Sequence, residues 1–211
     1  MAKKIMFNDK YGLTKSVLEG RKTQTRCIIK SPRKFRGQDI NGYYVYRNAD
    51  GVIVGICMKD YNDFPIDEGQ IVPKYKVGEI VAIAQSYHTI YYEFGLETMD
   101  MLVSKLKYSN GWTNKMFVKS EFMPHQIRIT NVRIERLQDI SDEDCLAEGI
   151  RKETRYSFIE NVKQLNGDSL VFSCNFDSPR EAYAELIDKV NGKGTWKNNP
   201  YVFVYDFELI K

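Results

Sequence analysis

Lys22 and Thr25 are the two residues of this sequence whose types and spacing could most directly do chemistry. They lie three positions apart in the cluster Gly20-Arg21-Lys22-Thr23-Gln24-Thr25-Arg26. A lysine without its extra proton can activate a hydroxyl as a nucleophile, whereas a protonated lysine can bind a phosphate. Seven basic residues and no acidic one occupy the sixteen positions 21–36, so the sequence leaves both chemistries open.

The elements on either side of this cluster should fix its position. Residues 13–20 predict a short helix with Thr14 as its N-cap and Gly20 just past its end, where a left-handed backbone is needed. Residues 23–29 are rich in β-forming side chains and predict a strand that carries Thr25 and Arg26. The basic cluster is therefore expected at a turn from a helix into a strand.

Other segments carry clear signals for helices and strands. Residues 141–149 predict a helix capped by Ser141, and residues 178–192 predict a second helix capped by Ser178. Alternating or continuous apolar runs predict a hairpin over 42–58 and strands over 80–84, 122–140 and 199–210. In the segment 122–140, the alternation of apolar residues shifts by one position near Asn131, which predicts a β-bulge. Residues 89–115 and 151–177 show no regular period.

Length and composition favour a single globular domain. The 211 residues can bury a real core, and the 43% hydrophobic and 13% aromatic content favours sheet. A formal net charge of +3 does not by itself indicate a polyanion partner. We expect one domain over 1–211, with insertions at about 33–70, 89–115 and 151–177.

The sequence also argues against several classes of protein. It has neither a membrane-spanning apolar run nor the apolar core of a secretory signal, which predicts a cytoplasmic protein without a membrane partner. Its four cysteines form no CxxC pair, and His88 and His125 lack cysteine or acidic partners at ligand spacing. We therefore expect neither a metal site nor a cofactor.

Several motifs together give the chain a family resemblance. They are the basic turn at 20–25, Lys76-Val77-Gly78-Glu79, the segment 127–148 that ends in a short acidic helix, and the aromatic strand at 202–209. In this order they resemble the ASCH family, whose fold is similar to the PUA domain. The resemblance covers about half of the chain, and the expected insertions fall outside it.

The resemblance implies both a fold and an activity. The implied fold class is α+β, a PUA-like small β-barrel with short flanking helices, hairpin or loop insertions, and a cleft that binds RNA or a modified nucleoside. Small members of the family are amidohydrolases that remove the acetyl group from acetylcytidine, and longer members resemble proteins of phages and mobile elements. The catalytic lysine, threonine and glutamate of that pattern fall on Lys22, Thr25 and Glu148.

In the implied reaction, the Thr25 hydroxyl attacks the amide carbonyl, Lys22 accepts its proton, and Glu148 protonates the leaving amine. The family usually has an arginine two residues after the threonine, but Cys27 stands there and the arginine is displaced to position 26. On a strand, a shift of one residue reverses the face from which a side chain projects.

Further residues are candidates for binding, and two other functions remain open. The substrate or nucleic-acid contacts are expected at Arg21, Thr23, Arg26, Arg33, Lys34 and Arg36. A non-catalytic RNA-binding module could use the same basic surface, and a protein-interaction role in a phage or mobile element is the third possibility.

Overall fold

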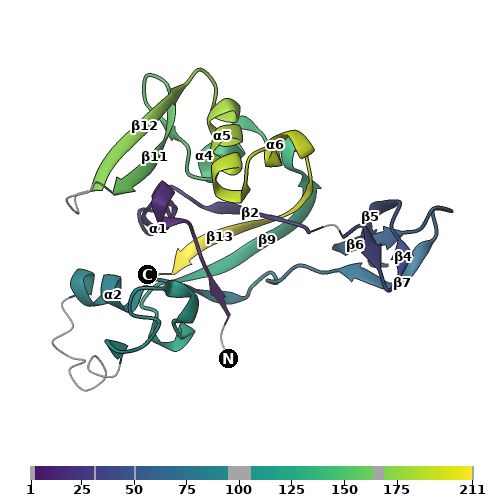
Figure 1. Cartoon of the computed structure of the whole chain (residues 1–211), viewed down its shortest axis with the longest axis horizontal. Coiled ribbons are helices and arrows are strands. Elements are labelled where there is room, and N and C mark those ends of the chain that lie inside the picture. Colours follow the sequence, from purple (N-terminus) through teal and green to yellow (C-terminus); the bar gives the residue numbers. More distant parts are fainter. Residues whose placement is uncertain (1–2, 31, 50, 95–105, 164–168, 211) are drawn as a thin grey trace.

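The computed structural model describes residues 3–30, 32–49, 51–94, 106–163 and 169–210, and Figure 1 shows their arrangement. The fold is α+β and consists mostly of strands, which confirms the predicted class in its general form. None of the described helices has both the length and the apolar character needed to cross a membrane.

The main sheet contains five strands in the order β1-β8-β9-β13-β2. Their bounds are β1 Lys4–Ile5, β8 Ile80–Ile83, β9 Gln126–Arg136, β13 Tyr201–Ile210 and β2 Gln24–Ile28. β1 runs parallel to β8, and the other neighbours are antiparallel. In the part of the chain that the structure describes, the outer strands β1 and β2 do not pair with each other, so the sheet is open rather than a closed barrel.

A β-bulge bends the long pair of β9 and β13. Ile129 pairs with Phe207 and Asn131 with Asp206, so Thr130 is the extra residue of β9. Ile127 and Ile129 are fully buried before the bulge, and Ile134 is buried after it. The slip of apolar phase predicted near Asn131 is confirmed, because one extra residue returns the next apolar side chains to the core.

Short helices pack around this sheet. They are α1 Leu13–Leu18, α2 Tyr87–Phe94, α4 Asp142–Ala147, α5 Pro179–Asn191 and α6 Thr195–Asn198, with 3-10 turns η1 Asp9–Tyr11, η3 Lys115–Phe117, η4 Ser120–Phe122 and η5 Leu137–Asp139. The predicted caps Ser141 and Ser178 both accept the expected backbone hydrogen bonds.

The predicted N-cap of α1 was wrong. Gly12, in a left-handed conformation with φ of 63°, precedes the helix, and Thr14 lies in its first turn. The 3-10 turn η1 was not predicted. Asn8 caps it, and Gly12 ends it. The Thr14 hydroxyl instead donates hydrogen bonds to the Phe7 carbonyl and the Asp9 carboxylate.

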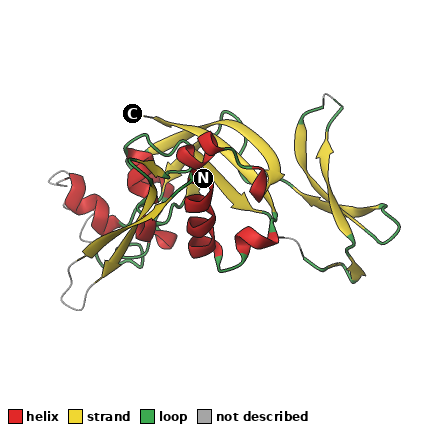
Figure 2. Ribbon diagram, turned by 90° about the horizontal axis from the view of Figure 1, so that it is seen from above, coloured by secondary structure: helices red, strands yellow, loops and turns green. Residues whose placement is uncertain are grey.

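A separate three-stranded sheet projects from one side of the molecule (Figures 1 and 2). It contains β5 Gly42–Arg47, β6 Ile53–Lys59 and β7 Pro65–Ile71, and the short pair β3 Lys34–Phe35 and β4 Gln38–Asp39 precedes it. β5 and β6 form the predicted hairpin, whereas β7 was not predicted.

Two segments without a clear sequence period, 89–115 and 151–177, contain regular elements in the parts that the structure describes, whereas residues 95–105 and 164–168 lie outside the described residues. The second segment contains the sheet β10 Arg151–Lys152, β11 Tyr156–Lys163 and β12 Ser169–Phe176. The helix α2 extends into the stretch from residue 89 that was expected to be irregular. Phe158 is buried edge-on against Tyr11, a contact between residues distant in the sequence that no local pattern reveals.

Candidate functional site

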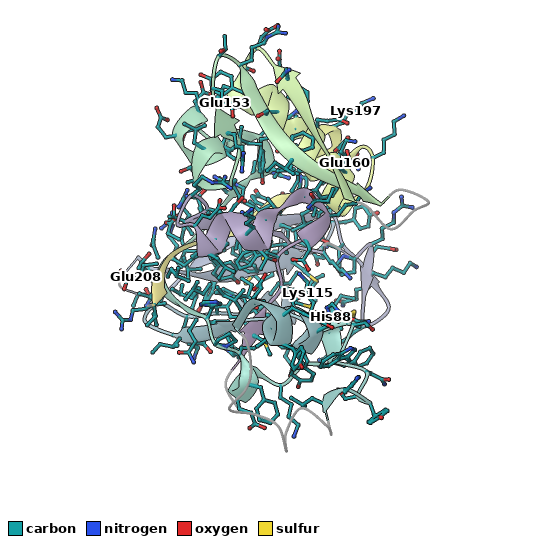
Figure 3. The ribbon with its side chains drawn as sticks, turned by 90° about the vertical axis from the view of Figure 1, so that its left-hand side faces the viewer. His88, Lys115, Glu153, Glu160, Lys197 and Glu208 are labelled. Carbon is teal, nitrogen blue, oxygen red and sulfur yellow. The ribbon has the colours of Figure 1, made fainter. Side chains whose placement is uncertain are left out.

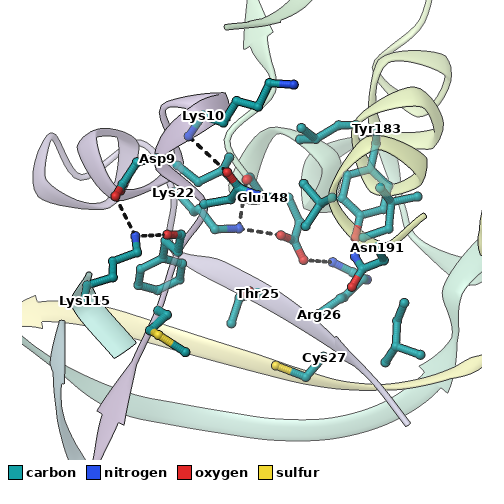
Figure 4. Close-up of a pocket in the computed structure, with 18 of the residues that line it drawn as sticks. Asp9, Lys10, Lys22, Thr25, Arg26, Cys27, Lys115, Glu148, Tyr183 and Asn191 are labelled. Atoms are coloured by element: carbon teal, nitrogen blue, oxygen red, sulfur yellow. Dashed lines mark hydrogen bonds and ion pairs between the residues drawn. The ribbon is translucent and has the colours of Figure 1, made fainter. Parts of the chain in front are cut away.

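A cavity of about 870 Å³ lies beside β2, which pairs only with β13 in the part of the main sheet that the structure describes. Its walls come from η1, β2, the end of α4, the apolar face of α5 and the start of η3 (Figure 4). Lys22, Thr25, Arg26, Cys27 and Glu148 all line it. The volume falls in the range of small-molecule sites.

Backbone contacts bring Lys22 and Glu148 together across 126 positions of sequence. The Lys22 amide donates to Ser16 in α1, and the Thr23 amide donates to Ala147 in α4, at 3.0 and 2.9 Å. Gly20 and Gly149 follow their helices with positive φ angles of 74° and 108°. A glycine tolerates this backbone without strain, so both helices can end where these two segments of the chain meet.

Lys22 and Glu148 form a buried ion pair. Lys22 Nζ lies 2.5 Å from Glu148 Oε2, and it also donates to the backbone carbonyls of Gln24 at 2.7 Å and of Glu148 at 2.9 Å. Only 2% of Lys22 is exposed. Burial lowers the pKa of the Lys22 ammonium below its ordinary value, although the Glu148 charge opposes this effect.

Thr25 lines the same cavity from β2 and is half-buried. Figure 4 shows it on the strand below the ion pair. Lys22 already has three acceptors, and no hydrogen bond joins Lys22 Nζ to Thr25 Oγ1 among the described contacts. In this structure the Lys22 ammonium therefore donates to these three acceptors and not to Thr25. The hydrogen bonds of a catalytic group often form only when substrate is bound.

Arg26 links Glu148 to a wider network of buried charge. Its fully buried side chain lies 3.2 Å from Glu148 Oε1, 2.6 Å from Glu135 Oε1 and 2.7 Å from Asp144 Oδ2. Desolvation opposes the charge on the guanidinium, but Glu148 and Glu135, with Tyr183, outweigh it and raise the Arg26 pKa. Arg26 therefore reaches the site and holds Glu148, the catalytic candidate.

Arg26 was expected on the opposite face of the strand from an arginine at position 27, and this placement explains which groups it contacts. Gln24 and Arg26 are buried on one face of β2, whereas Thr25 and Cys27 are half-buried on the other. Gln24 donates to Asp144 at 3.1 Å and to Asp206 at 2.6 Å, and its Oε1 accepts from Arg26. The displaced arginine therefore lies among carboxylates and polar side chains of this chain, where it fixes Glu148.

The predicted binding residues do not gather at the cavity. Arg21 pairs with Glu19 at 2.7 Å, and Thr23 is exposed on the turn. Lys34 lies 3.4 Å from Asp39, and Arg36 pairs with Glu68 in the projecting region. Arg33 is exposed, and no described carboxylate lies within ion-pair distance of it. Of the residues predicted to bind substrate or nucleic acid, only Arg26 lines the cavity.

Cys27 is a second nucleophile type in the cavity wall, but its environment suppresses the thiolate. Burial and the Glu148 charge raise the pKa of Cys27 to about 11. At pH 8 its thiolate fraction should therefore be about 100-fold below that of an ordinary thiol. We expect Cys27 in the native protein to react at least this much more slowly with iodoacetamide than in urea, as measured by peptide mass spectrometry. Equal rates in both states would contradict the raised pKa of Cys27.

Tyr183 on α5 lines the site but was not predicted as a site residue. It is 1% exposed and lines the cavity, and its hydroxyl oxygen has no hydrogen-bond partner among the described residues. Desolvation raises the pKa of this phenol well above its ordinary value, so it remains a neutral donor. Its place on the apolar face of the predicted helix was the available signal, but that signal does not distinguish a cavity wall from a core.

The rim of the cavity carries a further ion pair that was not predicted. Lys115 Nζ lies 2.8 Å from Asp9 Oδ2 and also donates to the Phe7 carbonyl. Neither residue belongs to a recognisable motif, and their contact joins η1 to η3 across about a hundred positions.

Metal ligands do not gather in the described part of the chain, where no three His, Cys, Asp or Glu side chains are arranged to hold an ion. The lining therefore offers acid–base and hydrogen-bonding groups rather than a ligand set. Comparisons with protein-family models, with curated proteins and with solved structures found no match to this chain.

Proposed function

We propose that this protein is an amidohydrolase that removes an acyl group from the exocyclic amine of a cytidine-like nucleoside. One observation carries the proposal: Lys22 and Thr25 line one cavity of about 870 Å³ together with Glu148, which lies 126 positions beyond Lys22. That volume suits a nucleoside with a short acyl group. The Tyr183 hydroxyl in the wall, which has no hydrogen-bond partner among the described residues, supplies a neutral donor for a polar substrate atom.

The buried ion pair can supply both the base and the acid of the reaction. Proton transfer from Lys22 to Glu148 along their 2.5 Å contact yields a neutral amine and a carboxylic acid. Burial lowers the pKa of the Lys22 ammonium, which eases the loss of this proton. The neutral amine has a lone pair that can accept the Thr25 proton once the amine turns away from the Glu148 hydroxyl.

The acyl group then passes from the nucleoside to Thr25. Thr25 Oγ1 bonds to the acyl carbon while its proton passes to Lys22, and the carbon–nitrogen bond breaks as Glu148 protonates the leaving amine. This leaves an acyl ester on Thr25 and restores the charged pair. A second proton transfer from Lys22 to Glu148 then lets Lys22 accept a proton from a water molecule as the water oxygen bonds to the acyl carbon. The ester bond breaks as Glu148 gives its proton to Thr25 Oγ1, which releases the acid and restores the charged pair.

The ASCH resemblance and a PUA-like fold are part of this proposal. Their support is that the three residues implied by the family pattern share one cavity, beside an open sheet flanked by short helices. A cytoplasmic location belongs to the same proposal, because free thiols such as Cys57 and Cys145 are typical of that compartment.

A non-catalytic RNA-binding module receives less support from the geometry. The basic run divides into a buried part at Lys22 and Arg26 and exposed residues that mostly pair with acids. Such pairs reduce the positive charge that a polyanion would meet. The cavity, by contrast, suits a small ligand.

The test is to incubate the protein with N4-acetylcytidine and to follow the release of cytidine by chromatography. We expect turnover that is lost in Lys22→Ala and in Glu148→Gln. Turnover that persists in both variants, or none in the unaltered protein, would contradict the proposal. In the second case, an RNA affinity that falls steeply with added salt would support the binding module.

A further inference from the structure

A second cavity, of about 470 Å³, shares Asp9 of η1 with the candidate active site. Its walls come from η1 and α1, from α2 with the residues before it, and from β11. Figure 3 shows α1 between the β11–β12 hairpin and α2, with His88 marking α2 and Glu160 marking β11. Asp9 lines both cavities, but none of the proposed catalytic residues lines the second.

Gln85 gives this cavity a buried acceptor without a donor. The residue is 3% exposed, and its backbone amide donates to Met123 Sδ at 3.3 Å. Its Nε2 donates to Glu93 Oε2 at 3.2 Å, while its Oε1 has no partner in the described part of the chain. Because a carboxylate only accepts, Nε2 must face Glu93, and this fixes Oε1 as the unpaired atom.

An unpaired buried acceptor is unfavourable unless a ligand supplies a donor. The charged groups of the wall show which kind of donor fits. Glu93 is exposed, and among the described residues its carboxylate accepts a hydrogen bond from the neutral Gln85 amide and forms no ion pair. The Asp9 carboxylate already pairs with Lys115 at 2.8 Å. Lys15, the cation of the wall, has a side chain that is 76% exposed and lies 3.9 Å from Glu19.

The neighbouring polar groups leave no strong competing donor for Gln85. Ser86 Oγ and Thr89 Oγ1 bond to each other at 2.8 Å, and the Asn161 amide donates to the Asp9 carbonyl at 2.9 Å. We propose that this cavity is a binding site for a small organic cation with several N–H donors, which Gln85 Oε1 and the Glu93 carboxylate bind together. A guanidinium group has both the charge and the donors, and a volume of about 470 Å³ accommodates a small molecule that carries one.

The test is a titration of the full chain with methylguanidinium, followed by amide chemical shifts in two-dimensional NMR. Tetramethylammonium is the matched probe, because it carries the same charge and no N–H donor. We expect saturable binding of methylguanidinium on the order of millimolar, with shifts centred on residues 85–93, and at least tenfold weaker binding of tetramethylammonium. Equal binding of the two cations, or no saturation by methylguanidinium, would overturn the proposal.

Two variants locate the binding, and a third is the control. Gln85→Met removes the unpaired acceptor, and Glu93→Gln removes the charge; each should weaken methylguanidinium binding at least tenfold. Glu208→Gln makes the same chemical change at an exposed position of strand β13 and should leave the affinity unchanged. An unchanged affinity in Glu93→Gln would also overturn the site, even if Gln85→Met failed to fold. Because this cavity contains none of the proposed catalytic residues, the result does not depend on whether acetylcytidine is a substrate.

Discussion

Replacing Lys22 with methionine is expected to lower the free energy of unfolding by about 3–5 kcal/mol. Methionine fills a similar volume but leaves Glu148 Oε2 without its donor at 2.5 Å. The carbonyls of Gln24 and Glu148 lose the same donor. Urea unfolding at neutral pH, followed by circular dichroism, measures the difference.

A double variant separates the ion pair from the packing of the lysine chain. Glu148→Leu in the Lys22→Met background removes the carboxylate that has lost its Lys22 partner, while Arg26 keeps Glu135 and Asp144 as partners. The double variant should therefore be more stable than the sum of the single effects implies, by about 1 kcal/mol or more. A single Lys22→Met variant within about 0.5 kcal/mol of the unaltered protein would be incompatible with a buried ion pair.

Thr25→Val is expected to abolish hydrolysis of N4-acetylcytidine while leaving the fold intact. Valine preserves the β-branched shape on β2 but has no hydroxyl to attack the acyl carbon. Loss of a nucleophile commonly lowers kcat by about three orders of magnitude or more. Steady-state kinetics with chromatographic detection of cytidine gives kcat, and thermal unfolding checks that the variant is folded.

Two matched variants sharpen the assignment of the nucleophile. Thr25→Ser keeps a hydroxyl at the same position and should retain measurable turnover. Cys27→Ser alters the other nucleophile type of the same strand face and should leave kcat within about threefold, because the Cys27 pKa of about 11 suppresses the thiolate. If Thr25→Val remained active and Cys27→Ser did not, the roles of the two residues would be reversed.

The elements that the sequence predicted well are those specified by short-range signals. Ser141 and Ser178 stand directly before their helices, and the apolar slip near Asn131 lies within one strand. The β11–β12 hairpin was missed because the contacts that support it, such as Phe158 with Tyr11, join distant segments. Thr14 was misassigned as a cap because the preceding turn is 3-10 and ends at Gly12.

In the candidate site, too, features set by neighbouring residues could be predicted, whereas those set by contacts between distant segments could not. Lys22 and Thr25 share one turn and strand, so their common placement could be expected from spacing alone. The choice of Glu148 as a site residue needed the family resemblance, because the ends of α1 and α4 meet through contacts between distant segments, such as the backbone hydrogen bond of Thr23 with Ala147. The partners of Arg26 come from β9 and α4, and the unpaired Tyr183 hydroxyl depends on a cavity that no local pattern describes.

The position of β13 between β9 and β2 has a consequence for how the site forms during synthesis. β2 and β9 both pair with β13, whose residues 201–210 are translated long after Lys22 and Thr25. Until those residues leave the ribosome, β2 has no partner in the main sheet. The wall that carries Thr25 and Arg26 therefore forms late, by contacts across almost the whole chain, and such contacts are typical of slow folding.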